Sequence, residues 1–333
     1  MADLWLVIAG VVLALVFDFG NGLNDAANAI STMVATKVLS FRAAALLSAV
    51  GNIAAAFLFS TAVAQTIGKG LIDPGAVTVE MVIAGIGGAI FWVYLASYLG
   101  LPVSASHSLI GGYVGSAFLA GGPQVLVAGG IWLVLAFIFI APVAGMVGGM
   151  LFSLGAAWMF RRARPARINR YFKRLQLVSA LVYSLSHGAN DAQKTIGIIT
   201  ILLFSGGMLT SFHVPFWVVL LSHLVIGAGT LAGGWKVVKT MGVRITKLKP
   251  VNGFCAETAG AAVIIFCSLF GIPVSTTHVI SGSIIGVGTM RRATAVRWNI
   301  ARNIVWAWII TIPVAALVGA MTYAVADVLG VIS

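Results

Sequence analysis

Long apolar stretches, interrupted by glycine and proline, follow one another along almost the whole chain. A helix that crosses the hydrocarbon core of a bilayer needs about 20 mostly apolar residues, and several of these stretches reach that length. Charged residues gather mainly in the connections between them. The pattern therefore predicts an all-α polytopic membrane protein with about 10 to 12 membrane elements.

The composition agrees with this pattern. Apolar residues make up 60% of the 333 residues and charged residues only 8%, whereas an ordinary soluble domain carries about 25% charged residues. This is too little charge to cover a globular surface in water. The composition argues against a soluble enzyme, and the meaning of the net charge of +12 depends on where the charges lie.

The basic residues mark one side of the membrane. Of the 20 Lys and Arg residues, 18 fall in four connections, at 37–42, 161–174, 236–249 and 291–302. Such clusters between apolar spans are typical of cytoplasmic loops. The excess charge therefore indicates a lipid bilayer rather than a nucleic acid as the partner. We expect a multi-pass protein of the plasma membrane, the inner membrane in a Gram-negative cell, with both termini outside.

Three motifs occur twice in the chain, in the same order. Gly-Leu-Asn-Asp-Ala (22–26) returns as Gly-Ala-Asn-Asp-Ala (188–192), Thr-Ile-Gly (66–68) as Thr-Met-Gly (240–242), and Gly-Leu-Pro-Val-Ser-Ala-Ser-His (100–107) as Gly-Ile-Pro-Val-Ser-Thr-Thr-His (271–278). The offset between the first and the second copy is nearly the same for all three motifs. The chain is thus predicted to contain two copies of one unit.

The loop charges indicate how the two copies are oriented. Residues 65–80 contain Lys69, Asp73 and Glu80, whereas the matching connection at 236–249 carries five basic residues. Opposite charge in equivalent loops predicts inverted-topology repeats with broken helices and re-entrant hairpins, a recurring architecture of secondary transporters. The expected divisions are a first repeat at 1–124, a linking membrane segment and basic loop at 125–174, a second repeat at 175–290, and a basic loop with a C-terminal membrane helix at 291–333.

Each Asn-Asp motif places a carboxylate inside an apolar stretch. An ionisable residue at the bilayer centre costs about 2.5 to 3.5 kcal/mol on insertion, so Asp25 and Asp191 are candidates for function. Together with Asn24, Asn190 and the preceding glycines, they predict a break in a membrane helix whose exposed ends bind an anion and a cation side by side. The alternative is a polar kink that only stabilises helix packing.

The Pro-Val-Ser motif predicts the start of a helix in each repeat. Proline disfavours helix in the residue before it, and the hydroxyl residues that follow suit an N-cap. Two such helix starts present hydroxyls and unpaired N–H groups, which can converge on one tetrahedral oxyanion. Ordinary caps of buried helices are the alternative. The hydroxyl residues concerned are Ser104, Ser106, Ser275, Thr276 and Thr277.

Two further positions break the symmetry between the repeats. Glu257 aligns with Ile86 and so has no acidic counterpart in the first repeat. This asymmetry suits a coupling-ion ligand or a proton carrier better than one member of a symmetric cage. Lys194 aligns with Asn28. It either neutralises a dianion or pairs with Asp191.

Three stretches resemble the signatures of a known family: Gly-Leu-Asn-Asp-Ala-Ala-Asn-Ala at 22–29, Gly-Ala-Asn-Asp-Ala-Gln-Lys at 188–194, and Pro-Val-Ser-Thr-Thr-His at 273–278. The family is that of the inorganic phosphate transporters (PiT), and the chain looks like a compact prokaryotic member over nearly its whole length. The resemblance implies a secondary active phosphate symporter, not an enzyme, driven by sodium or protons and assembled as a homodimer. No other cofactor or metal is expected.

The resemblance also implies roles for individual residues. Those expected to line the phosphate site are Asn24, Asp25, Ser104, Ser106, Asn190, Asp191, Ser275, Thr276 and Thr277. From the chemistry of the residues themselves, the candidate ligands of the coupling ion are Asp25, Asn28, Asp191 and Glu257, and the candidate accessory residues are Asn21, Asn52, His187 and Lys194. Some family members carry a functionally important glutamate where this sequence has Asn52.

The chemistry of the substrate separates the competing transport functions. Phosphate near pH 7 keeps at least one P–OH group that can donate a hydrogen bond to a carboxylate, whereas sulfate has none. Carboxylates beside an anion site therefore favour phosphate. A sulfate permease of the same superfamily is the first alternative and an anion channel the second. An intramembrane enzyme is not supported, because the sequence has neither a nucleophile elbow nor metal-ligand spacing.

Overall fold

The computed structural model describes residues 4–58 and 60–330, and over these residues the chain folds into twelve α-helices. The first half contains α1 (Leu4–Ala35), α2 (Phe41–Ala54), α3 (Ala62–Lys69), α4 (Val79–Leu99), α5 (Ala105–Gly121) and α6 (Ala128–Met159). The second half contains α7 (Pro165–Ser205), α8 (Phe216–Ala232), α9 (Trp235–Lys239), α10 (Pro250–Leu269), α11 (Thr276–Arg291) and α12 (Trp298–Val328).

Among the described residues, five helices are long and apolar enough to cross a membrane: α1, α4, α6, α10 and α12. Two bent pairs raise this number to seven when each pair counts as one span. They are Phe41–Phe57 with α3, bent by 82°, and α8 with Trp235–Gly242, bent by 68°. The predicted all-α polytopic membrane architecture with broken helices is therefore confirmed.

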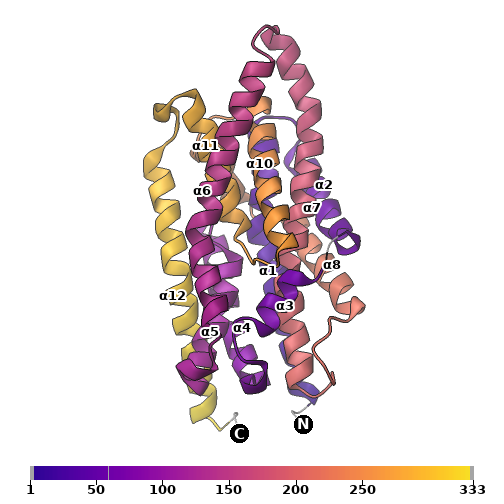
Figure 1. The fold of residues 1–333 in the computed structure, drawn as a ribbon, viewed down its shortest axis with the longest axis vertical. Coiled ribbons are helices and arrows are strands. Elements are labelled where there is room, and N and C mark those ends of the chain that lie inside the picture. Colours follow the sequence, from indigo (N-terminus) through magenta and orange to yellow (C-terminus); the bar gives the residue numbers. More distant parts are fainter. Residues whose placement is uncertain (1–3, 59, 331–333) are drawn as a thin grey trace.

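The two halves follow the same order of six helices and have opposite orientations. Figure 1 shows α4 and α5 in the lower half of the bundle and α10 and α11 in the upper half, so equivalent hairpins enter from opposite ends. Helix α1 begins and α12 ends at the bottom of this view, whereas the basic turn between α6 and α7 lies at the top. The fold thus has the inverted repeats that the loop charges predict.

Each half ends on a long helix that contains a proline, Pro142 in α6 and Pro313 in α12. The offset between these two prolines is the same as that between Pro102 and Pro273 in the repeated motif. We infer that the repeated unit includes this sixth helix. It is therefore longer than the units at 1–124 and 175–290 that the short motifs mark.

The predicted helix break at the Asn-Asp motifs is wrong. Helices α1 and α7 run unbroken through both motifs, and the bends fall in the next pair of helices along the chain. The glycines have another use: a Cβ on Gly22 would lie 2.2 Å from the carbonyl oxygen of Ile226, and one on Gly188 would lie 2.7 Å from backbone atoms of Asn52. These glycines let α8 and α2 approach closely, which outweighs the weak helix propensity of glycine.

The sixth helix of each half packs against the other half. Gly282 and Gly286 on α11 approach α6 so closely that a Cβ on either would lie 2.1 Å from an α6 carbonyl oxygen. Gly111 and Gly115 on α5 repeat the arrangement against α12, at 2.7 and 2.2 Å. Small residues four apart let helix backbones approach in membranes, where van der Waals packing drives association. Because α6 packs against the second half and α12 against the first, these two helices join the repeats.

We predict that Gly286→Ala destabilises the protein by about 1 to 3 kcal/mol, because the added methyl group meets backbone that cannot move aside. The melting temperature of the detergent-purified protein measures the effect. Gly155→Ala on α6 is the matched control, since a Cβ there meets nothing within 4 Å. Equal melting temperatures for the two variants would contradict this packing.

Candidate functional site

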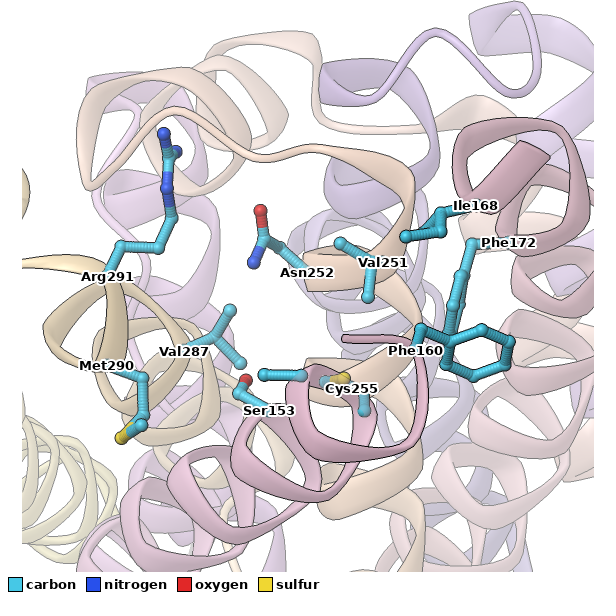
Figure 2. A pocket seen from close by; sticks show the side chains of 12 residues that line it. Ser153, Phe160, Ile168, Phe172, Val251, Asn252, Cys255, Val287, Met290 and Arg291 are labelled. Carbon is cyan, nitrogen blue, oxygen red and sulfur yellow. The ribbon is translucent and has the colours of Figure 1, made fainter. Parts of the chain in front are cut away.

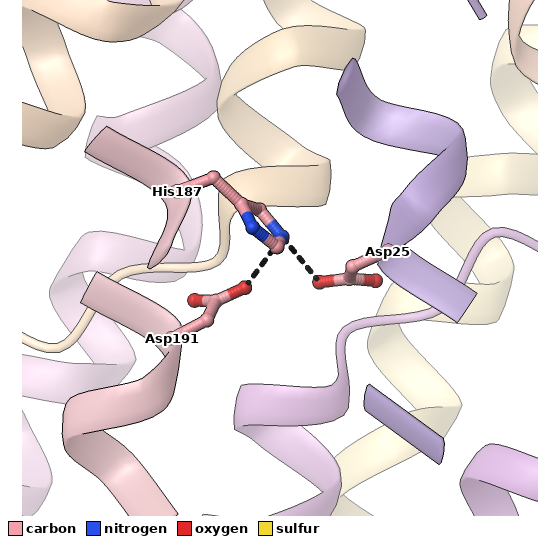
Figure 3. A group of neighbouring side chains, drawn as sticks. All are labelled: Asp25, His187 and Asp191. Carbon is pink, nitrogen blue, oxygen red and sulfur yellow. Dashed lines mark ion pairs between the residues drawn. The ribbon is translucent and has the colours of Figure 1, made fainter. Parts of the chain in front are cut away.

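Asp25 on α1 and Asp191 on α7 meet in the interior of the bundle, where they are 1% and 0% exposed. Thr276, the first residue of α11, bridges them: its Oγ1 lies 2.8 Å from Asp191 Oδ2 and 3.2 Å from Asp25 Oδ2. His187 lies between the same carboxylates, with Nε2 3.1 Å from Asp191 and 3.9 Å from Asp25 (Figure 3). The structure thus brings together the two symmetry-related carboxylates.

A helix starts at each Pro-Val-Ser motif, as predicted. Ser104 and Ser275 are the N-caps of α5 and α11. Each hydroxyl accepts a hydrogen bond from the N–H of the histidine three residues on, His107 at 3.1 Å and His278 at 3.3 Å. Ser104 and Ser275 therefore act as ordinary N-caps, and this role is compatible with oxyanion binding. The hydroxyl groups that follow each cap remain available for other contacts.

The two helix starts face each other across the pseudo-two-fold axis. Ser106 Oγ on α5 donates to the carbonyl oxygen of Val274 at 3.4 Å. In the other direction, Thr277 Oγ1 on α11 lies 3.2 Å from the carbonyl oxygen of Val103 and 3.1 Å from Asp25 Oδ1. Hydroxyl groups from both repeats therefore converge beside the carboxylates.

Lys194 and Asn28 occupy equivalent places on the two sides of this group. Lys194 forms a buried ion pair with Asp191 and also donates to Ser106 Oγ at 2.5 Å. Asn28 Nδ2 donates to Thr277 Oγ1 at 2.9 Å. Of the two alternatives for Lys194, the pairing with Asp191 is the one that these contacts display.

A chain of hydrogen bonds fixes the orientation of the His187 ring. Thr230 Oγ1 donates to the carbonyl oxygen of Ile226 and accepts from Asn52 Nδ2, both at 2.9 Å. The Asn52 amide oxygen therefore faces His187 Nδ1, at 3.0 Å, and accepts a hydrogen bond from the Nδ1–H group. His187 Nε2 then faces two carboxylates, an arrangement that needs a proton or a cation between them.

The asparagines of the two motifs have partners that the sequence did not indicate. Asn24 Nδ2 donates to Ser97 Oγ and Asn190 Nδ2 to Ser268 Oγ, each at 2.9 Å. The side-chain oxygens of both asparagines, and that of Asn21, are buried without a hydrogen-bond partner among the described residues. The offset between Ser97 and Ser268 equals that between the two Pro-Val-Ser motifs. A search for single polar residues at the repeat spacing would have found this pair.

Glu257 on α10 belongs to a separate buried cluster. Its carboxylate accepts from Gln176 Nε2 at 2.9 Å and from Ser179 Oγ at 2.5 Å, both on α7. These residues precede Asp191 by 15 and 12 positions in one continuous helix, which corresponds to about 18 to 22 Å along its axis. The structure therefore does not place Glu257 beside the two aspartates, although its sequence position suggested a shared ion site.

An apolar cavity of about 250 Å³ lies between α6, α7, α10 and α11. Figure 2 shows Phe172 and Cys255 in its wall and Arg291 at its edge. Phe172 lies one helical turn before Gln176, and Cys255 lies two residues before Glu257. The cavity is therefore next to the Glu257 cluster and apart from the paired aspartates.

Comparisons with known proteins show which family the chain resembles. The phosphate transporter family matches the chain twice, over residues 21–169 and 158–319. A probable low-affinity inorganic phosphate transporter of Rhizobium meliloti is 49% identical over 323 residues, which are 97% of each chain. One from Bacillus subtilis is 41% identical over 323 residues, or 96% of each chain.

The fold has a counterpart among solved structures. A sodium-dependent phosphate transporter superposes with a TM-score of 0.88, over 98% of this chain and 100% of the other, at 24% sequence identity. This similarity concerns the fold. The double family match and the identity to full-length relatives show more, namely that the chain belongs to the phosphate transporter family.

Proposed function

We propose that this protein is a secondary active symporter that imports inorganic phosphate, coupled to sodium or protons, by alternating access. The observation that supports this function most directly is the meeting of two capped helix starts and two carboxylates at one buried point. The names of the relatives indicate transport rather than catalysis. The inverted repeats suit alternating access, since each repeat can open the central group to one side of the membrane.

Phosphate fits the chemistry of the central group. The starts of α5 and α11 supply N–H groups and the hydroxyls of Ser106, Thr276 and Thr277, which are donors for the phosphate oxygens. Asp25 and Asp191 can accept a hydrogen bond from the P–OH group, which sulfate lacks. A bound phosphate competes with the carboxylates for the threonine hydroxyls, so a cation is needed to stabilise the carboxylates at the same time.

The coupling cation has a suitable place at the same group. Asp25, His187 and Asp191 offer three ligand atoms within 4.8 Å of one another (Figure 3). A proton on His187 Nε2 or a sodium ion on the carboxylates balances their charge, and either one favours phosphate binding by linkage. The Thr277 hydroxyl, which accepts from the Asn28 amide, adds a neutral oxygen on the Asp25 side. We assign Glu257 to a second step, in which a cation passes toward the basic end of the bundle.

The orientation and assembly that we propose follow the charges and the family resemblance. The turn between α6 and α7 and the connection between α11 and α12 lie at the end opposite to the start of α1. We place this basic end in the cytoplasm of a plasma-membrane protein, with both termini outside. A homodimer is the assembly that the resemblance implies.

The proposed function is tested by uptake of radiolabelled phosphate into proteoliposomes, with sodium and pH varied independently. We expect phosphate to accumulate against its gradient only while a sodium or proton gradient is present, and excess sulfate to compete poorly. Flux that continues without either gradient and never concentrates phosphate would instead support an anion channel. Accumulation of sulfate in place of phosphate would support a sulfate permease.

We predict that Asp25→Asn and Asp191→Asn each lower the initial rate of uptake by at least about 100-fold, because a buried charge interaction worth about 3 kcal/mol is lost. Asp327→Asn, at an exposed carboxylate on α12, is the control and keeps the rate of the wild type. Gel filtration of each variant checks that it folds. Near-normal uptake by both buried variants would rule out the carboxylate site.

Glu257→Gln is predicted to shift the dependence on the coupling ion while the protein still folds, because glutamine keeps the hydrogen-bonding shape but not the charge. The sodium or proton concentration that gives half-maximal uptake is expected to change about tenfold. Glu80→Gln, at the start of α4, is the control. If the sodium and pH profiles of Glu257→Gln match those of the wild type, the glutamate is structural.

A further inference from the structure

Lys194 is a basic residue of the central group whose counterpart in the first repeat is an amide; the offset that pairs it with Asn28 also pairs His187 with Asn21. When the two Asn-Asp motifs are aligned, Asp25 corresponds to Asp191 and Asn28 to Lys194. Asn28 and Lys194 each stand three positions after the aspartate of their own motif on an unbroken helix. Each therefore lies on the same face of its helix as that aspartate. One repeat thus carries an amide where the other carries an ammonium group.

The Lys194 ammonium group is held by three kinds of oxygen. It pairs with the carboxylate of Asp191 and donates to the hydroxyl of Ser106 at 2.5 Å and to the carbonyl of Val274 at 2.7 Å. The residue is 1% exposed. An ammonium group has three N–H donors, so these three acceptors satisfy it completely.

The same three kinds of oxygen gather in the other half of the group. Thr277 Oγ1, the counterpart of the Ser106 hydroxyl, lies 3.1 Å from Asp25 Oδ1 and 3.2 Å from the carbonyl oxygen of Val103. Val103 corresponds to Val274 in the second copy of the Pro-Val-Ser motif. At the position that corresponds to Lys194, the uncharged amide of Asn28 donates to Thr277 Oγ1 at 2.9 Å. Carboxylate, hydroxyl and carbonyl oxygens are a suitable set of ligands for a hard cation.

The charges in the group explain why this difference matters. Two buried carboxylates and an incoming phosphate are all negative, and unbalanced charge of one sign inside a membrane protein is costly. A symmetric site with an asparagine in both halves would need a mobile cation beside each aspartate. Here one of the two positions already holds a positive charge that is attached to the chain.

We propose that Lys194 is a fixed counterion that replaces one of two coupling cations, so that each phosphate is carried with one mobile cation fewer than a symmetric site requires. This inference rests on the proposed symport. Because Lys194 already pairs with Asp191, the remaining mobile cation binds on the Asp25 side of the cation site proposed above, where Thr277 and the Val103 carbonyl add oxygens. An ammonium group that contacts phosphate directly is the competing role for Lys194.

The test is the number of charges moved with each phosphate. Purified protein in proteoliposomes is clamped with potassium and valinomycin, and the potential at which phosphate flux vanishes is measured at set phosphate, sodium and proton gradients. Lys194→Asn restores the residue of the first repeat, and we expect the charge moved per phosphate to rise by one positive unit. Lys194→Arg is the matched control, since it keeps the fixed charge and is expected to keep the charge ratio of the wild type.

Equilibrium binding of radiolabelled phosphate to the detergent-purified protein gives a second measurement that needs no transport. Without sodium and at high pH, Lys194→Asn is expected to bind phosphate about 5 to 150 times more weakly than the wild type, and sodium or added protons should restore the affinity. If neither cation restores it, Lys194 contacts phosphate directly and the proposal fails. An unchanged charge ratio overturns it as well.

The reciprocal variant covers the case in which Lys194→Asn does not fold. Asn28→Lys adds a second fixed ammonium group, so phosphate binding is expected to lose its dependence on sodium and protons. An unchanged dependence contradicts the proposal. Wild-type vesicles that do not accumulate phosphate would contradict the proposed symport itself, a result distinct from any outcome with the variants.

Discussion

Two carboxylates that are buried between helices of an apolar bundle, Asp25 and Asp191, impose the main constraint on this structure. A charge in such a place must be paired and hydrogen-bonded, and the surrounding groups meet that need with Thr276, His187 and Lys194. Each of these groups comes from a helix start or a long helix that must stay in register to within about an ångström. In the function that we propose, the bound phosphate and its cation replace some of these internal contacts, because the groups of the site already balance buried charge.

Close helix packing is what holds these groups in place. The glycines at the Asn-Asp motifs admit α2 and α8 against the long helices, and the paired glycines of α5 and α11 admit α12 and α6. Since α6 and α12 each pack against the other repeat, the two hairpin tips are drawn to one point. The inverted repeat therefore produces a central group with donors from both halves, where neither half alone would enclose one.

The framework is symmetric and the charges on it are not. Lys194 stands where the first repeat has Asn28, and Glu257 has an isoleucine as its counterpart. Both differences fall on polar groups, whereas the glycines and prolines that shape the helices are kept in both halves. In the mechanism that we propose, the symmetric scaffold lets the two faces alternate, and the unequal charges set how many ions move with each phosphate.

Local patterns were sufficient for the membrane spans, the repeats, the helix starts at Ser104 and Ser275, and the pairing of the two aspartates, because these depend on hydropathy, proline geometry and recurrence along the chain. Only the tertiary structure decided that α1 and α7 stay unbroken, since backbones from other helices fill the space that the glycines leave. It also decided which side chains meet. His187 contacts Asn52, which is 135 positions away in the sequence, and Glu257 accepts a hydrogen bond from Gln176, which is 81 positions away. Such partners come from separate helices, and their contact depends on packing that no local pattern contains.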